Sequence, residues 1–162
     1  MTLADKIALM RDGEIVQYDS PRELYNSPDD VFGGWFLGNP GMNFFEGLFA
    51  GGNGHGANVP IFAKPVNLNG MNGDAANLTL GIRPEHVRIS ASQTADSVQA
   101  KVLNKSIIVG GQYLLTLQIG DESDAVNCKA KTTAQIGREL GKDVWVEFCL
   151  LYTSDAADEW LR

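Results

Sequence analysis

The chain has 162 residues and an apolar content of 44%, which suits one domain with a hydrophobic core, or one domain plus a shorter segment. Its net charge is -7 without any basic run, which argues against a nucleic-acid-binding protein, because phosphate contacts need lysine and arginine. The sequence shows no signal peptide and no apolar run near the ~20 residues that span a bilayer, and its two cysteines have neither metal-site nor disulfide-framework spacing, so the reducing cytosol is the expected compartment.

The chain begins with a predicted β-hairpin. Residues 1–6 are polar and are expected to form the last turn of a helix. A short apolar run, Ile7–Met10, and a second segment, Glu14–Tyr18, flank the dipeptide Asp12-Gly13. This dipeptide is typical of two-residue hairpin turns, because glycine accepts the positive φ that a type I′ turn requires. We therefore predict two antiparallel strands over residues 7–18.

Two short helices are predicted next. Ser20 can cap a helix that starts at Pro21, and Glu23 completes the pattern of a capping box. A second Ser-Pro start at Ser27 precedes apolar residues at helical spacing within residues 31–37. A hairpin with two short helices is too small to hold a core alone, so we expect it to be the edge of something larger.

A β domain is predicted after a linker. Residues 38–41, Gly-Asn-Pro-Gly, end the helical pattern and predict the linker. Residues 42–148 contain many short segments at close spacing, which is typical of a small barrel or sandwich. The expected strands are residues 43–49, 59–62, 78–82, 87–90, 98–105, 107–109, 113–119, 126–131 and 144–148. The expected loops and connections are residues 51–56, 67–77 and 132–140, the last with a break at Gly137.

A proline-fixed corner organises this β domain. Residues 78–82 alternate between apolar and other residues, as in a half-buried strand. Pro84 cannot donate to a sheet ladder and pushes Arg83 towards extended geometry, and a new strand starts at Val87. Arg83 and Glu85 are expected to pair with each other or to cap neighbouring backbone groups, in preference to binding a ligand.

The corner also carries a family resemblance. Gly81, Ile82, Arg83, Pro84, Glu85 and His86 spell G-I-R-P-E-H. This hexapeptide resembles the signature of the transport-associated OB (TOBE) domain in ATP-binding subunits of ABC importers for maltose, other oligosaccharides and glycerol-3-phosphate. Three further stretches match in order: residues 1–15 resemble the segment after the switch histidine of the ATPase domain, residues 20–28 its closing helix, and residues 40–44 the junction into the C-terminal domain.

The resemblance implies a mainly β fold class. It implies an OB-like TOBE barrel over residues 42–148, preceded by a β-hairpin and two short helices over residues 1–37 from the end of an α/β ATPase domain, with residues 38–41 as the linker. The chain would then be a C-terminal fragment of an importer subunit, with a regulatory and dimerising role. The implied partners are a second copy of the subunit and the transmembrane permease subunits, and the implied place is the inner face of the cell membrane.

No catalytic, cofactor-binding or metal-ligating residue is predicted in this chain. The glycine-rich residues 51–56 lack the Lys-Ser/Thr that a phosphate loop needs, and ATP and Mg²⁺ are implied only for the full-length parent. His55 and His86 have no nucleophile at a recognisable spacing. The residues Gly81–His86 are therefore predicted to be a structural corner and not a reaction site.

The alternative function is a stand-alone OB-type module that binds a small ligand such as an oxyanion. Such a module has no need for residues 1–40, so these residues favour the importer subunit.

Residues 149–162 depart from the family pattern, and from Cys149 to Glu159 they match the translation of a transposon-end sequencing adapter. We therefore interpret residues 149–162 as a non-native tail and exclude them from fold reasoning.

Overall fold

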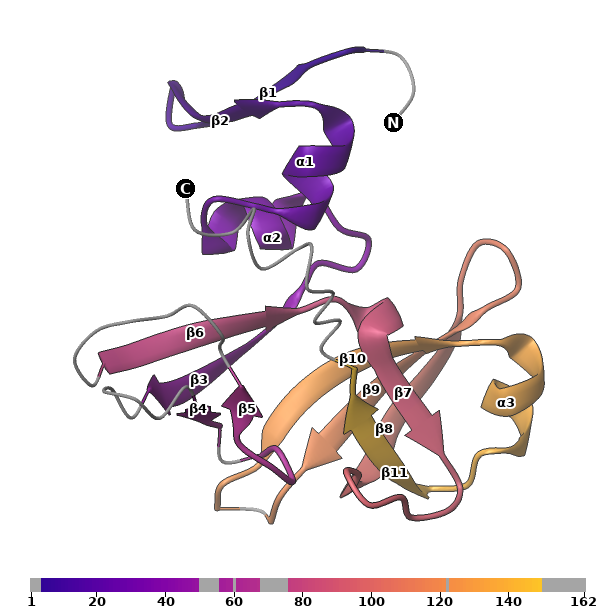
Figure 1. Ribbon diagram of the computed structural model, residues 1–162. Helices are drawn as coiled ribbons and strands as arrows, with labels where there is room; N and C mark the ends of the chain where they lie inside the picture. The colour runs from indigo at the N-terminus through magenta and orange to yellow at the C-terminus, as the bar shows by residue number, and fades with distance from the viewer. Residues whose placement is uncertain (1–3, 50–55, 60, 68–75, 122, 150–162) are drawn as a thin grey trace.

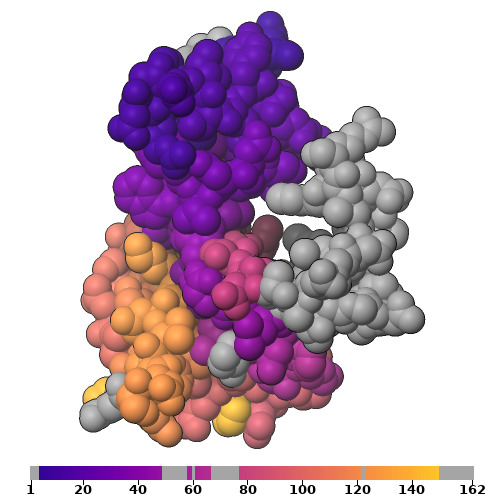
Figure 2. Space-filling view, turned by 90° about the vertical axis from the view of Figure 1, so that its left-hand side faces the viewer, coloured from indigo at the N-terminus to yellow at the C-terminus, as the bar shows by residue number. Residues whose placement is uncertain are grey.

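The computed structural model describes residues 4–49, 56–59, 61–67, 76–121 and 123–149 (Figure 1). Residues 7–37 form a small hairpin–helix unit, drawn in indigo and purple, and the later residues form two curled β-sheets, here called the barrel. Figure 2 shows the hairpin–helix unit seated on one end of the barrel. The predicted fold class, mainly β with a hairpin and two short helices in front, is confirmed.

The hairpin has the predicted turn. Strands β1 (Ile7–Arg11) and β2 (Glu14–Asp19) pair antiparallel. Between them Asp12 has φ 53° and Gly13 has φ 88°, the two positive values that a type I′ turn requires. The expected helical turn before the hairpin is wrong for residues 4–6, which are not helical, and residues 1–3 lie outside the described chain.

Both predicted helices form, but one starts later than expected. In α1 (Pro21–Asn26) the hydroxyl of Ser20 accepts the backbone N–H of Glu23 at 3.2 Å. In α2 (Val31–Phe36) the cap is Asp30, whose carboxylate accepts the N–H of Gly33 at 2.7 Å. Ser27 cannot cap α2, because it is the C-terminal cap of α1.

The barrel consists of two antiparallel sheets that share one core. The smaller sheet has the order β5-β4-β3-β6 and the larger one the order β10-β9-β8-β11-β7. The smaller sheet contains β3 (Asn43–Phe49), β4 (Gly56–Asn58), β5 (Val66–Asn67) and β6 (Ala76–Ile82). The larger one contains β7 (Val87–Ser90), β8 (Val98–Ile107), β9 (Tyr113–Ile119), β10 (Val126–Thr132) and β11 (Asp143–Phe148). The short 3₁₀ helix η1 (Pro84–His86) leads from β6 into β7, and so from one sheet to the other.

Aromatic and aliphatic side chains from both sheets fill the barrel. Leu115 and Leu117 of β9 are completely buried, and Val146 of β11 packs in the same cluster. Phe45 of β3 packs edge-on against Phe148 of β11, with 5.3 Å between ring centroids, and so joins the smaller sheet to the larger one. The whole core cluster lies within residues 45–148, so none of it belongs to the hairpin–helix unit.

The predicted strand over residues 59–62 is wrong. Val59 follows β4 and is buried, and the N–H of Phe62 bonds to the carbonyl of Val59 at 2.9 Å in a turn, with Pro60 outside the described chain. These apolar residues are explained by core packing and not by strand pairing. Of the predicted loop over residues 67–77, Asn67 belongs to β5 and residues 76–77 belong to β6.

The predicted connection over residues 132–140 contains a helix. This helix, α3 (Ala134–Glu139), is capped by Thr133, whose hydroxyl accepts the N–H of Ile136 at 3.4 Å. Gly137 does not break the helix but brings it close to the sheet, because a Cβ there would stand 2.5 Å from the ring of Tyr113. Strand β8 also runs without a break through residue 107, with a bulge between Val102 and Asn104.

The C-terminal limit of the described chain is Cys149, whose N–H donates to the carbonyl of His86 at 3.0 Å. The interpretation of residues 150–162 as an adapter-derived tail therefore falls outside the described residues, as does the loop prediction for residues 51–55. No helix in the described part of the chain is long and apolar enough to cross a membrane.

Candidate functional site at the Gly81–His86 junction

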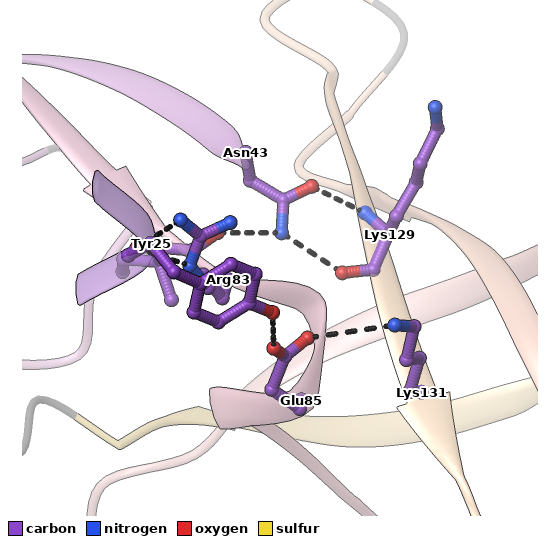
Figure 3. Close-up of polar contacts among 7 residues, drawn as sticks. Tyr25, Asn43, Arg83, Glu85, Lys129 and Lys131 are labelled. Atoms are coloured by element: carbon purple, nitrogen blue, oxygen red, sulfur yellow. Dashed lines mark hydrogen bonds and ion pairs between the residues drawn. The ribbon is translucent and has the colours of Figure 1, made fainter. Parts of the chain in front are cut away.

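The G-I-R-P-E-H residues lie where the hairpin–helix unit and both sheets meet (Figures 1 and 3). Gly81 and Ile82 end β6, and Pro84 starts η1. Arg83 between them has φ -73° and ψ 145°, the extended geometry that a following proline favours. This geometry gives the corner a fixed shape before any side-chain contact forms.

Arg83 holds the end of helix α1. Its guanidinium Nε donates to the carbonyl oxygen of Tyr25 at 3.1 Å, and Nη2 donates to the same oxygen. Carbonyls in the last turn of a helix have no partner within the helix, so this contact satisfies one of them. The guanidinium carbon also lies 3.5 Å from the centroid of the Tyr25 ring. Arg83 is only 3% exposed, and this burial lowers the pKa of its guanidinium, an effect that Tyr25 and Glu85 oppose.

Glu85 extends the contact to the barrel. The hydroxyl of Tyr25 donates to one Glu85 carboxylate oxygen, and the other oxygen lies 3.8 Å from Nζ of Lys131 on β10 (Figure 3). Burial acts to raise the pKa of Glu85, but the Tyr25 hydroxyl, the backbone, Lys131 and Arg83 outweigh it, so this pKa is lowered. Burial and Glu85 raise the pKa of the Tyr25 hydroxyl. The result is a continuous polar chain from α1 through η1 to β10.

Asn43 joins the two sheets. Its Nδ2 donates to the carbonyl of Ile82 at 3.2 Å and to that of Lys129 at 2.9 Å, and its Oδ1 accepts the N–H of Lys129 at 2.7 Å. The side-chain amide thus takes the place of a neighbouring strand beside β10, which is an edge strand of the larger sheet. Sequence reasoning missed this role. The available signal was an asparagine at the start of a strand, where the residue is depleted.

Two glycines let helix α2 approach β6. A Cβ at Gly81 would lie 3.2 Å from the sulfur of Met42 and 3.3 Å from the ring of Phe44. A Cβ at Gly34 of α2 would lie 2.7 Å from the same sulfur and 3.1 Å from the same ring. Met42 and Phe44 therefore lie between two glycine backbones, and a side chain at either position would push the helix away from the strand.

The remaining residues of the hexapeptide serve the backbone and the core. Ile82 is 3% exposed and belongs to the core cluster, Pro84 is buried, and His86 offers its carbonyl to Cys149. The contacts described at this junction hold parts of the chain together. Within the described residues no group of three or more His, Cys, Asp or Glu is placed to hold a metal ion. That the chain contains no catalytic residue stays a prediction.

Two protein-family descriptions match the chain in succession. The MalK OB fold domain matches residues 38–87, and the TOBE domain matches residues 80–149. The matches overlap at residues 80–87, so both contain the hexapeptide and neither contains the hairpin–helix unit.

Curated relatives agree with these domains. The chain is 30% identical over 154 residues to the xylose/arabinose import ATP-binding protein XacK of Haloferax volcanii, covering 91% of the chain and 38% of that protein. It is 31% identical over 147 residues to the oligosaccharides import ATP-binding protein MsmX of Bacillus subtilis, covering 86% and 40%. It is 32% identical over 168 residues to the sn-glycerol-3-phosphate import ATP-binding protein UgpC of Vibrio vulnificus, covering 98% and 42%.

The chain thus spans about two fifths of the length of these relatives. The two domain matches together cover residues 38–149, and the identity to the relatives extends over most of the chain. The chain belongs to the family of ABC importer ATP-binding proteins and corresponds to a C-terminal segment that carries their MalK OB fold and TOBE domains.

Proposed function

We propose that this chain is the regulatory and dimerising segment of the ATP-binding subunit of an ABC transporter that imports sugars or related solutes. The observation that carries the proposal is the succession of the MalK OB fold and TOBE matches across one corner. The names of the relatives, which specify xylose and arabinose, oligosaccharides and glycerol-3-phosphate, support a solute of this chemical kind.

In this proposal the hairpin–helix unit is the end of the ATPase domain. The uncovered apolar surface of the unit supports this assignment. Its exposed apolar side chains are Met10, Ile15 and Tyr18 on the hairpin and Val31, Trp35 and Phe36 on α2. In a longer protein the rest of the ATPase domain would cover part of this surface. That ATPase domain, and not this chain, would bind ATP and Mg²⁺. The barrel itself carries out no hydrolysis.

The partners in this proposal are a second copy of the subunit and the transmembrane permease subunits. The barrel would contribute to pairing of the two ATP-binding subunits, and the permease subunits would hold the complex at the inner face of the cell membrane. The net charge of -7 supports the view that nucleic acid is not a partner.

A domain exchange tests the proposal. Residues 4–148 replace the matching segment of UgpC, to which the chain is 32% identical over 168 residues. We expect the chimera to hydrolyse ATP and to restore glycerol-3-phosphate uptake in cells that lack UgpC. A matched chimera with Asn43→Ala and Arg83→Met should lose uptake because its junction is broken. A chimera that folds and hydrolyses ATP without restoring any uptake would contradict the proposal.

The alternative, a stand-alone module for a small oxyanion, is tested on the chain itself. Calorimetric titration with molybdate, tungstate and sulfate should show no binding if the importer proposal is correct. Stoichiometric binding of one of these anions, together with failure of the chimera, would favour the stand-alone module. Titration with ATP should likewise show no binding to the isolated chain, because its sequence has no phosphate loop.

A further inference from the structure

We propose that Arg83 is the positioning residue of a latch that sets the orientation of the hairpin–helix unit on the barrel and that can open while the barrel stays folded. The proposal goes beyond the importer function and does not depend on it. It follows from the way in which two residues of one corner hold a single residue of α1.

Tyr25 is fixed at three points. Arg83 binds its backbone carbonyl with two N–H groups and covers the face of its ring, and the Glu85 carboxylate accepts a hydrogen bond from its hydroxyl. Three attachment points on one residue define an orientation, whereas a single hydrogen bond leaves rotation about its own axis free. Arg83 and Glu85 flank Pro84 in a rigid corner between β6 and η1. Their contacts with Tyr25 therefore fix the orientation of α1 relative to these two elements and, through the Glu85–Lys131 ion pair, relative to β10.

The other contact between the two parts is less directional. Met42 and Phe44 lie against the glycine backbones of α2 and β6, and apolar contacts of this kind tolerate small rotations. A backbone hydrogen bond from the N–H of Met42 to the carbonyl of Gly34, at 3.2 Å, joins the start of the barrel to α2. We infer that this contact acts as the pivot and that the Arg83 contact decides the angle.

One hydrogen-bond donor of Arg83 has no partner among the described residues while the latch is closed. Nη1 of Arg83 is buried without a hydrogen-bond partner in the described part of the chain, although guanidinium nitrogens seldom stay unpaired when buried. This nitrogen lies beside Gly38 of the linker, where a Cβ would stand 3.0 Å from it. If the unit and the linker moved away from the corner, water would reach the nitrogen, while Glu85 would keep its contact with Lys131. The unpaired donor therefore favours opening and the contacts to Tyr25 favour closure, which is the balance expected of a reversible latch.

The test measures the distance between the two parts by pulsed electron–electron double resonance. Spin labels are placed on the full chain at Glu14→Cys and Glu139→Cys, both exposed, in a Cys149→Ser background. Cys128 stays unlabelled because it is buried and its pKa is raised to about 12. Labelled chain is diluted with excess unlabelled chain, so that contacts between molecules do not contribute to the signal.

We expect one narrow distance distribution for the parent and for the matched control Arg88→Met, which removes an exposed arginine of β7. Arg83→Met should replace the single maximum by a broad distribution with a second maximum, while the thermal midpoint of the barrel stays close to that of the parent. Arg83→Lys and Tyr25→Phe should give intermediate widths, because each keeps part of the attachment.

An unchanged single maximum in Arg83→Met would overturn the proposal. Loss of the barrel fold in that variant, seen by circular dichroism, would also overturn it, since the latch must open without unfolding the barrel. The two milder variants test the proposal independently. If Arg83→Lys and Tyr25→Phe both keep the distance distribution of the parent, Arg83 does not position the unit.

Discussion

The barrel and the hairpin–helix unit differ in how completely each encloses its apolar side chains. The barrel buries a continuous apolar cluster from Phe45 to Val146, and strands of both sheets contribute its side chains. The unit buries only Leu9 and Leu24 among its large apolar residues, and it exposes Trp35 by 60%. One part of the chain is therefore a domain with a core, and the other is a surface layer that depends on its neighbours.

Strand pairing explains the difference. The barrel closes because the side chain of Asn43 covers the edge of β10 and because η1 carries the chain from one sheet to the other. The unit has only two strands, and an isolated two-stranded hairpin is marginally stable in water. Its one face is covered by its own helices, as shown by Gly33, where a Cβ would lie 3.3 Å from Leu9. The other face is open.

The largest expected effect comes from the barrel core. Leu117→Ala removes a completely buried side chain and should lower the free energy of unfolding by about 2–5 kcal/mol. Leu24→Ala, at an equally buried position of the unit, should melt α1 and leave the barrel transition in place. Urea unfolding followed by circular dichroism measures both. If Leu24→Ala lowers the barrel midpoint as much as Leu117→Ala does, the two regions share one core and the comparison is wrong.

The exposed face of the unit should cause association. Each large apolar side chain left in water forgoes roughly 1.5–3 kcal/mol of burial energy, and a patch of them promotes contacts between molecules. We expect Trp35→Ser with Phe36→Ser to restore a monomer in sedimentation velocity at tens of micromolar. The matched control, Ile107→Ser with Val109→Ser on the barrel hairpin, changes two similarly exposed side chains and should leave the association unchanged. A monomeric parent chain would argue against this prediction.

Removal of the Asn43 side chain should weaken the closure of the barrel. Asn43→Ala leaves the carbonyl and N–H of Lys129 and the carbonyl of Ile82 without this partner, at a cost of about 1–3 kcal/mol. Asn127→Ala changes an exposed residue of β10 and serves as the control. Hydrogen exchange should speed up along β10 in the first variant only. Equal protection of β10 in both variants would show that Asn43 does not hold the two sheets together.

Two glycines close together in sequence should respond in opposite directions. Gly137→Ala places a Cβ 2.5 Å from Tyr113 and should destabilise the barrel by roughly 1–3 kcal/mol. Gly141→Ala meets nothing within 4 Å and should stabilise it by about 0.4–1 kcal/mol, through the lower entropy of the unfolded chain. Thermal unfolding of both variants measures the difference. Equal midpoints would mean that α3 does not pack closely on Tyr113.

The smallest expected effect is a pH dependence of the junction. The folded-state pKa of Glu85 is lowered below its ordinary value of 4.5, so its contribution to stability is present above that value and is lost as the pH falls through the lowered pKa. Glu85→Gln should flatten the dependence of the thermal midpoint on pH in this range, whereas the control Glu46→Gln, on an exposed part of β3, should not. A steeper dependence in Glu85→Gln would mean that its pKa is raised and not lowered.

The sequence by itself determined the elements that depend on a few neighbouring residues. The type I′ turn at Asp12-Gly13, the cap at Ser20 and the strands Asn43–Phe49 and Tyr113–Ile119 were predicted because turn, cap and period-2 signals act within a few positions. The family was also predicted from the hexapeptide and its flanking stretches, and the domain matches agree. The predicted boundaries of the domains and of the tail stay predictions.

Only the tertiary structure decided which distant residues meet. Gly137 was expected to break a connection, but it lies within a helix, and a glycine stands there because the ring of Tyr113 occupies the space of its Cβ. Arg83 was expected to pair with Glu85 or to cap backbone groups, and the structure selects the carbonyl of Tyr25, which lies 58 positions away in the sequence. Asn43 finds Lys129 across 86 positions. No local signal encodes such contacts, because they form only when the packing of the whole core brings these segments together.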